Sequence, residues 1–250
     1  MLFALPLFIG LAWWAGRGQP TLGRRDVAVI AGLGFSGYYL ASYLDFIGLS
    51  YISASLERLI LYLSPTLVLA LGAVLFGRRV SWRQAGALAV SYAGVLIVFG
   101  REVTLAGADV ALGAGLVFAS AVSYAFYLVY SGEEVRRIGA ARLAGWASSV
   151  ACVLCIVQFL LLRPLSALRV APEVIGLSLL NATLSTFAPV LMVMLAIERI
   201  GAPLTAQIGM IGPLATIAMG VLLLGEQFTV WTAAGTALVM VGIGLLTRWR

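Results

Sequence analysis

The chain has 250 residues, of which 62% are hydrophobic and only 10% charged, and its mean hydropathy is +1.06. Soluble domains carry about 25% charged residues, so this composition excludes a soluble protein and predicts an all-α, polytopic membrane helix bundle. The net charge of +6 reflects sixteen basic residues, all Arg, mostly in short loops. That distribution indicates membrane topology rather than nucleic-acid binding.

The chain lacks the residues most often used for metal binding and covalent catalysis. It has no His, the commonest metal ligand, and no Lys to act as a Schiff-base nucleophile. Cys152 and Cys155 share a helical face, but a metal site needs more ligands than these two. We interpret them as small residues that pack between helices, and we expect neither a metal nor a cofactor.

Apolar segments follow one another along the whole chain with short connections. A helix needs about 20 apolar residues to cross a bilayer. We expect nine spans, at 1–16, 27–46, 52–76, 82–100, 110–131, 142–162, 173–197, 202–224 and 229–247.

The segment 52–76 contains two charges, Glu57 and Arg58, and Glu57 is the only acidic residue placed within a span. A charge at a helix centre costs about 2.5–3.5 kcal/mol, so it needs a reason. Adjacent residues point about 100° apart on a helix, so we expect the two not to pair with each other. Two interpretations stay open: snorkelling or pairing with another helix, and lining of a substrate cavity. Glu57 is the better candidate for the second.

Aromatic and polar side chains form stripes on four of the predicted spans. Tyr side chains suit organic ligands because they combine a flat apolar face with a hydroxyl, whereas Asn and Gln are costly in lipid unless they bind something or pair between helices. The candidate substrate-binding residues, besides Glu57 and Arg58, are Tyr39, Tyr43, Tyr124, Tyr127, Asn181 and Gln207.

Three prolines lie inside apolar segments and predict helix breaks. Pro65, Pro189 and Pro213 each remove one backbone hydrogen bond. A carbonyl that loses its hydrogen-bond partner is tolerated in a membrane only where it faces other protein groups or a water-filled cavity. Each proline therefore marks either a kink that serves helix packing or a break that surrounds a site.

The Arg distribution predicts the orientation. Twelve Arg lie in one set of loops and three, Arg101, Arg163 and Arg169, in the opposite set. The positive-inside rule places the first set and the C-terminus in the cytoplasm of a bacterial-type inner (plasma) membrane. Nine spans then put Met1 outside, without the basic region of a signal peptide.

The two halves of the chain repeat. Pro65 and Pro213 are 148 residues apart, and so are Gly77 and Gly225. The expected repeats are residues 1–100 and 110–250. By this offset the first repeat lacks its first helix, which leaves two alternatives: an N-terminal helix missing from this sequence, or a protein of nine spans. Because five helices per repeat is an odd number, the repeats are inverted, with a site near the midplane.

These residues resemble the EamA-type members of the drug/metabolite transporter superfamily. The resemblance rests on Ser53-Ala-Ser-Leu56, Ser64-Pro65, Arg199-Ile-Gly-Ala202, Gly212-Pro213 and Leu222-Leu-Leu-Gly-Glu226. It implies two inverted five-helix repeats, here helices two to five and six to ten. It also implies a central cavity and peripheral helices five and ten. The chain departs from the family pattern in two respects. It lacks helix one, and it has Gly77-Arg78 where its second half has the more usual Gly225-Glu226.

The sequence therefore predicts a carrier that moves small organic metabolites across the inner membrane by alternating access, with export as the expected direction. Its expected partners are a small-molecule substrate and the lipid bilayer, with no nucleic acid; the oligomeric state is not specified. The alternatives are a truncated, non-transporting membrane scaffold and an intramembrane enzyme such as a lipid-group transferase. The enzyme is disfavoured because acid–base residues are few.

Overall fold

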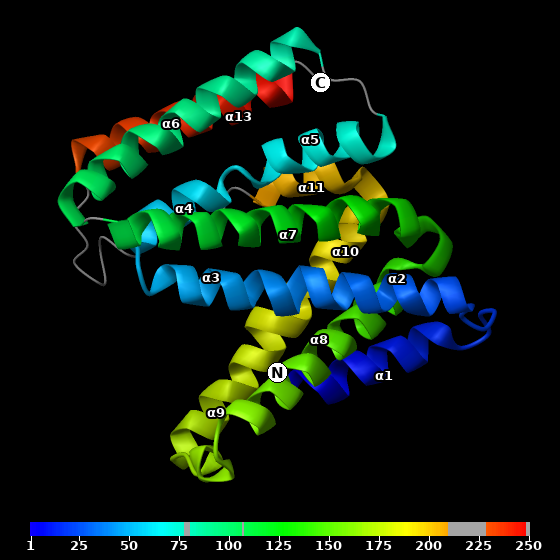
Figure 1. The fold of residues 1–250 in the computed structure, drawn as a ribbon. Coiled ribbons are helices and arrows are strands. Elements are labelled where there is room, and N and C mark those ends of the chain that lie inside the picture. Colours follow the sequence, from blue (N-terminus) through cyan, green and yellow to red (C-terminus); the bar gives the residue numbers. More distant parts are fainter. Residues whose placement is uncertain (78–80, 107, 210–228, 249–250) are drawn as a thin grey trace. The chain divides into compact units, whose positions relative to one another are not determined.

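A computed structural model describes residues 1–77, 81–106, 108–209 and 229–248, and all regular structure within these ranges is helical (Figure 1). The predicted all-α class is therefore confirmed for the described residues. The chain forms two compact units. Unit 1 contains Met1–Leu40 and Tyr130–Ala202, and unit 2 contains Ala41–Val129 and Pro203–Arg250. Each unit thus draws on both halves of the sequence.

Within the described ranges, six helical stretches are long and apolar enough to cross a membrane. They are Arg24–Leu49, Leu56–Phe76, Trp82–Gly100, Asp109–Ile138, Ala140–Leu162 and Pro172–Ile200. The predicted first and last spans correspond to shorter apolar helices, Ala4–Gly16 and Ala233–Leu245. Most of the predicted span 202–224 lies outside the described residues. The nine-span pattern thus stays a prediction.

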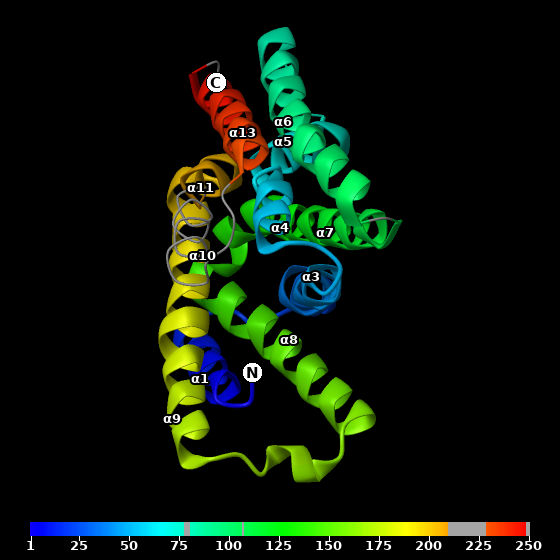
Figure 2. The same cartoon turned by 90° about the vertical axis from the view of Figure 1, so that its left-hand side faces the viewer.

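Unit 1 is built around helix α8. Its elements are α1 (Ala4–Gly16), α2 (Arg24–Gly34), the π-helix η1 (Phe35–Leu40), the end of α7 (Ala108–Ile138), α8 (Ala140–Leu162), the 3₁₀ turn η2 (Leu165–Leu168), α9 (Pro172–Leu180), the π-helix η3 (Asn181–Phe187) and α10 (Ala188–Ile200). Helices α1, α2 and α10 all pack against α8, and α9, η3 and α10 follow one another as one long helical stretch (Figure 2).

Helices α1 and α8 pack closely because small residues meet where they cross. A Cβ added to Gly145 would lie 2.7 Å from the backbone nitrogen of Ala12, so only Gly fits there. At the other end of α1, the Cys152 Sγ lies 3.6 Å from the Met1 Sδ. Residue numbers rise along α1 as they fall along α8, so the two helices are antiparallel. Cys152 is buried in this seam, in line with its interpretation as a packing residue.

Unit 2 contains α3 (Ala41–Leu49), α4 (Ala54–Leu61), α5 (Ser64–Phe76), α6 (Trp82–Ala106), residues 108–129 of α7, α11 (Ala202–Gly209) and α13 (Val230–Arg248). Helix α3 crosses α7 at a second glycine contact, where a Cβ on Gly48 would lie 2.8 Å from the Gly113 carbonyl oxygen. The Ser120 hydroxyl, on α7, donates a hydrogen bond of 2.7 Å to the carbonyl of Ala41. Polar and close-packed contacts together fix this pair.

Helices α6 and α13 run side by side and antiparallel (Figure 1). A Cβ on Gly94 would lie 2.7 Å from the Gly235 carbonyl oxygen, and one on Gly242 would lie 2.8 Å from the Ala87 carbonyl oxygen. The sequence has recurring glycines in these two segments, Gly86 with Gly94 and Gly235 with Gly242, a pattern that predicts close helix packing. Gly94, Gly235 and Gly242 lie at such close contacts. Gly86, which belongs to the same pattern, is different, because a Cβ there would meet nothing within 4 Å.

Candidate functional site

The segment that the sequence singled out is broken as predicted. Helix α4 ends at Leu61, α5 begins at Ser64, and Pro65 occupies the first turn of α5, where its missing N–H costs nothing. The Ser64 hydroxyl donates a hydrogen bond of 2.7 Å to the carbonyl of Leu61, four residues before Pro65, which has no N–H to donate to it. The Thr66 hydroxyl donates to the Leu63 carbonyl at 2.6 Å. Side-chain hydroxyls thus stabilise the break.

Glu57 is buried one turn before this break. Its exposed fraction is 1%, and its Oε2 lies 3.1 Å from the Nε of Arg58, whose side chain is 31% exposed. The expectation that the two would not pair was wrong. Neighbouring residues do point in different directions, but the long Arg side chain can fold back. The Arg58 Nε–H is not aligned for a hydrogen bond, so the contact is an ion pair at short range.

Four of the predicted polar residues lie in the same unit as Glu57. Tyr124 and Tyr127 stack on α7 with their ring centroids 5.8 Å apart, and Tyr127 is fully buried. Tyr43, on α3, is 42% exposed, and Gln207, on α11, is half-buried. The predicted site residues in unit 2 thus comprise the buried Glu57 carboxylate, the Arg58 guanidinium and a set of amphipathic side chains.

Two predicted residues, Tyr39 and Asn181, lie in unit 1 instead. Tyr39 is in the π-helix η1, with its ring centroid 5.8 Å from that of Phe35, and Asn181 is the exposed first residue of η3. Regular 3.6-residue spacing was assumed for both stripes, and the wider π turns break that spacing. π turns are frequent at functional sites, but they leave no simple mark in the sequence.

The η3 turn also explains how Pro189 is accommodated. Pro189 follows η3 in the first turn of α10, so no α-helical hydrogen bond is lost there. The Thr183 hydroxyl donates to the Leu179 and Leu180 carbonyls, both at 3.0 Å, where the helix widens. The break predicted at Pro189 is therefore a change of helix type. Pro213 lies outside the described residues.

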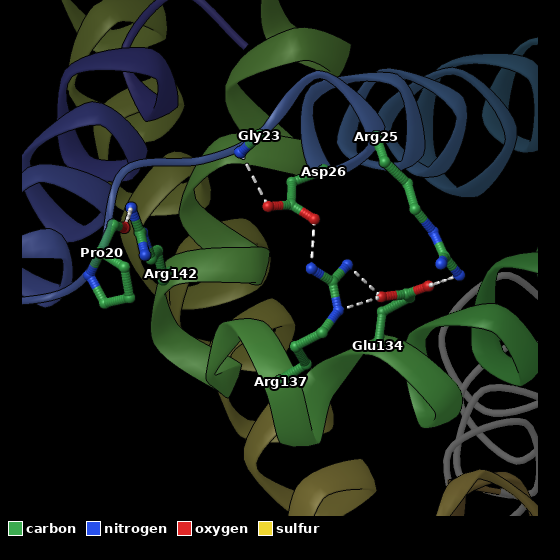
Figure 3. Close-up of polar contacts among 7 residues, drawn as sticks. All are labelled: Pro20, Gly23, Arg25, Asp26, Glu134, Arg137 and Arg142. Carbon is green, nitrogen blue, oxygen red and sulfur yellow. Dashed lines mark hydrogen bonds and ion pairs between the residues drawn. The ribbon is translucent and has the colours of Figure 1, made fainter.

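A second charged group, the Asp26 cluster, was not predicted. It comprises Asp26, Arg25, Glu134 and Arg137, at the start of α2 and the end of α7 (Figure 3). Arg137 pairs with Asp26 and, through Nε at 3.0 Å and Nη2 at 2.5 Å, with Glu134. Arg25 lies 3.6 Å from the other oxygen of Glu134.

The Asp26 cluster corrects the placement of acidic residues along the chain. Helix α7 continues to Ile138, past the predicted end at residue 131, so Glu134 lies inside a candidate span and is 8% exposed. Glu57 is therefore not the only buried carboxylate. Two local signals could have revealed the cluster. Asp26 accepts the Gly23 N–H at 2.9 Å as an N-terminal capping residue, and Glu134 and Arg137 are three residues apart on a helix.

Comparisons with known proteins agree with the resemblance stated above. The chain matches the EamA-like transporter family over residues 1–100 and 111–248. It is 30% identical over 240 residues to the "Uncharacterized transporter YcbK" of Bacillus subtilis (strain 168), covering 90% of this chain and 74% of that protein. The chain is also similar to a solved crystal structure, with 23% sequence identity and a TM-score of 0.68. The match covers all of this chain and 88% of the other chain, and the two have the same fold.

Proposed function

The chain belongs to the EamA-like transporter family and is an integral membrane transporter, and from this premise we propose that it exports small organic metabolites by alternating access. Its proposed location is the inner membrane, with the C-terminus in the cytoplasm. Family membership favours this carrier over the intramembrane enzyme and over a scaffold without transport activity.

The observation that carries the proposal is the buried Glu57 beside a broken helix. Keeping a charge in a span costs about 2.5–3.5 kcal/mol, and at the helix break beside it side-chain hydroxyls replace backbone N–H groups as the partners of two carbonyls. Both occur within two turns, between Glu57 and Pro65. A substrate site needs polar groups of this kind, because they can exchange a hydrogen-bond or ion-pair partner within the protein for one on the substrate. A purely structural helix does not need them.

We assign the substrate site to residues of unit 2. Glu57 and Arg58 supply charges of opposite sign, so the site can bind an organic molecule through either an ammonium or an anionic group. Tyr43, Tyr124, Tyr127 and Gln207 supply flat apolar faces and hydrogen-bonding groups for the rest of such a molecule. Tyr39 and Asn181 stay predicted substrate-binding residues.

Helix packing supports the proposed inverted repeats, residues 1–100 and 110–250. Helices α1 and α8 are the expected second and seventh helices, and α6 and α13 are the expected fifth and tenth. Each pair therefore joins equivalent positions of the two repeats. Both pairs are antiparallel, which is the relation that inversion across the membrane requires.

The test is a comparison of membrane vesicles of opposite orientation from cells that produce the protein. A ¹³C-labelled cell extract serves as the probe, and mass spectrometry identifies what accumulates inside. Everted vesicles are expected to accumulate at least one small organic metabolite faster than right-side-out vesicles and vesicles without the protein. Faster uptake by right-side-out vesicles would overturn export, and no difference from the protein-free vesicles would overturn transport of extractable metabolites.

A further inference from the structure

A pocket of about 460 Å³ lies in unit 1, where the end of α7 turns into the start of α8. It is lined by Trp14, Ala15, Gln19, Arg136, Arg137, Ile138, Gly139, Ala140, Ala141 and Arg142. Three of these lining residues are arginines, and none is acidic. The pocket thus has a positively charged wall, an apolar wall formed by Trp14, and a volume in the usual range for small-molecule sites.

The three arginines differ in what they already bind. Arg137 is held by both carboxylates of the Asp26 cluster, so its charge is largely compensated. Arg142 donates from Nη2 to the Pro20 carbonyl at 2.9 Å, while its Nε is buried with no hydrogen-bond partner among the described residues (Figure 3). Arg136 is exposed and forms no ion pair within the described part of the chain. Arg136 and Arg142 therefore have charge to offer a ligand.

The start of α8 adds to this positive potential. The first backbone N–H groups of a helix have no partner within the helix and carry a partial positive charge. Glu198 accepts the Ala140 N–H at 3.1 Å, but the N-cap is Gly139, which has no side chain to cap the groups that follow. An anion in the pocket would meet both these N–H groups and the guanidinium groups, and phosphate oxygens suit both.

The apolar wall indicates where such a phosphate comes from. Trp14 continues a stripe of exposed residues at four-residue spacing, Gly10 and Pro6 on α1 and Leu2 just before it, and Trp14 itself is 65% exposed. This stripe runs along a helix of the membrane domain from the edge of the pocket. An acyl chain can lie along it while the headgroup occupies the pocket. A soluble phosphate would make no use of the stripe.

We propose that this pocket binds the phosphate of an anionic phospholipid headgroup, with Arg136 and Arg142 as its ligands and an acyl chain along the outer face of α1. The pocket shares no residue with the proposed substrate site, and the proposal does not depend on what the protein transports. Basic pockets at the cytoplasmic ends of membrane helices are known to bind anionic headgroups.

The test is native mass spectrometry on the full chain, purified in detergent and titrated with phosphatidylglycerol. An arginine near a membrane surface contributes about fivefold to the binding of an anionic lipid. Arg136→Gln is therefore expected to weaken binding about fivefold, and Arg136→Gln with Arg142→Gln about 30-fold. Arg163→Gln, at the opposite end of α8, is the matched control and is expected to bind like the wild type.

Two further ligands separate the possible sources of the phosphate. Phosphatidylcholine has the same chains and a phosphate but no net negative charge, and it is expected to bind more weakly. Glycerol 3-phosphate has the charge without the chains and is expected not to displace phosphatidylglycerol. Displacement by glycerol 3-phosphate would overturn the lipid source, and equal binding of the two lipids would overturn charge recognition. Wild-type affinity in Arg136→Gln, which removes no internal contact, would exclude the pocket as the site.

Discussion

At the scale of single residues, the pair of Glu57 and Arg58 links burial to function. Glu57→Gln keeps the volume of the side chain and deletes its charge. We expect uptake per folded molecule to fall about tenfold or more, because a charged contact to substrate is worth about 1.5–3 kcal/mol. Arg58 also loses its counter-ion at 3.1 Å, so stability should fall by about 1–3 kcal/mol. Uptake and thermal stability are measured on the same purified protein.

Glu173→Gln is the control for this substitution. Glu173 lies exposed in the first turn of α9, so its loss should leave uptake unchanged. If Glu57→Gln lowers stability but leaves uptake per folded molecule at the wild-type value, Glu57 is a structural ion-pair residue outside the substrate site. Unchanged stability together with lost uptake would show that the charge acts on substrate alone.

The sequence identified Glu57 but not its partner. A carboxylate within an apolar run is conspicuous because its cost is high, so its importance could be predicted. Its pairing depends on the conformation of the Arg58 side chain, which backbone periodicity does not determine. The Asp26 cluster shows the same limit, since it joins α2 to α7 across more than 100 positions of the chain.

At the scale of helices, the seam between α6 and α13 offers a matched pair of glycines. Gly94→Ala would place a Cβ 2.7 Å from the Gly235 carbonyl oxygen and 2.9 Å from a methyl group of Val239. Such overpacking costs about 1–3 kcal/mol. Gly86→Ala on the same helix meets nothing within 4 Å and should leave stability unchanged or raise it by up to about 1 kcal/mol.

Thermal melting in detergent compares these two variants directly. An equal change in stability for both variants would contradict the seam, because the approach of α13 would then make no difference between the two positions. Sequence spacing predicted that glycines mark close packing but not which of them does. Gly86 and Gly94 are eight residues apart, about 80° around a helix, so only one of them reaches the contact.

The sequence predicted some helix boundaries and breaks correctly and missed others, for a physical reason. Pro65 marks the break after Leu61 because proline lacks a donor, and this signal is local. The π turns η1 and η3 contain ordinary residues, and local spacing does not distinguish them from α-helix. The end of α7 was placed too early because Glu133, Glu134, Arg136 and Arg137 were read as a loop, whereas they extend the helix.

At the scale of the whole molecule, the distribution of Arg predicts which ends of the helices face the cytoplasm. Unit 1 offers a test at its two opposite ends. Gln19, between α1 and α2, lies on the Arg-rich side, and Ser166, in η2 after α8, lies on the other. Both residues are exposed, so a cysteine at either position can react.

We expect a membrane-impermeant maleimide to label Ser166→Cys in intact cells, and Gln19→Cys only after the membrane is permeabilised. Cys152→Ala and Cys155→Ala provide the background, because both native thiols lie within α8. The reason is energetic: Arg-rich loops stay in the cytoplasm during insertion, and here twelve Arg oppose three. Labelling of Gln19→Cys alone in intact cells would reverse the topology.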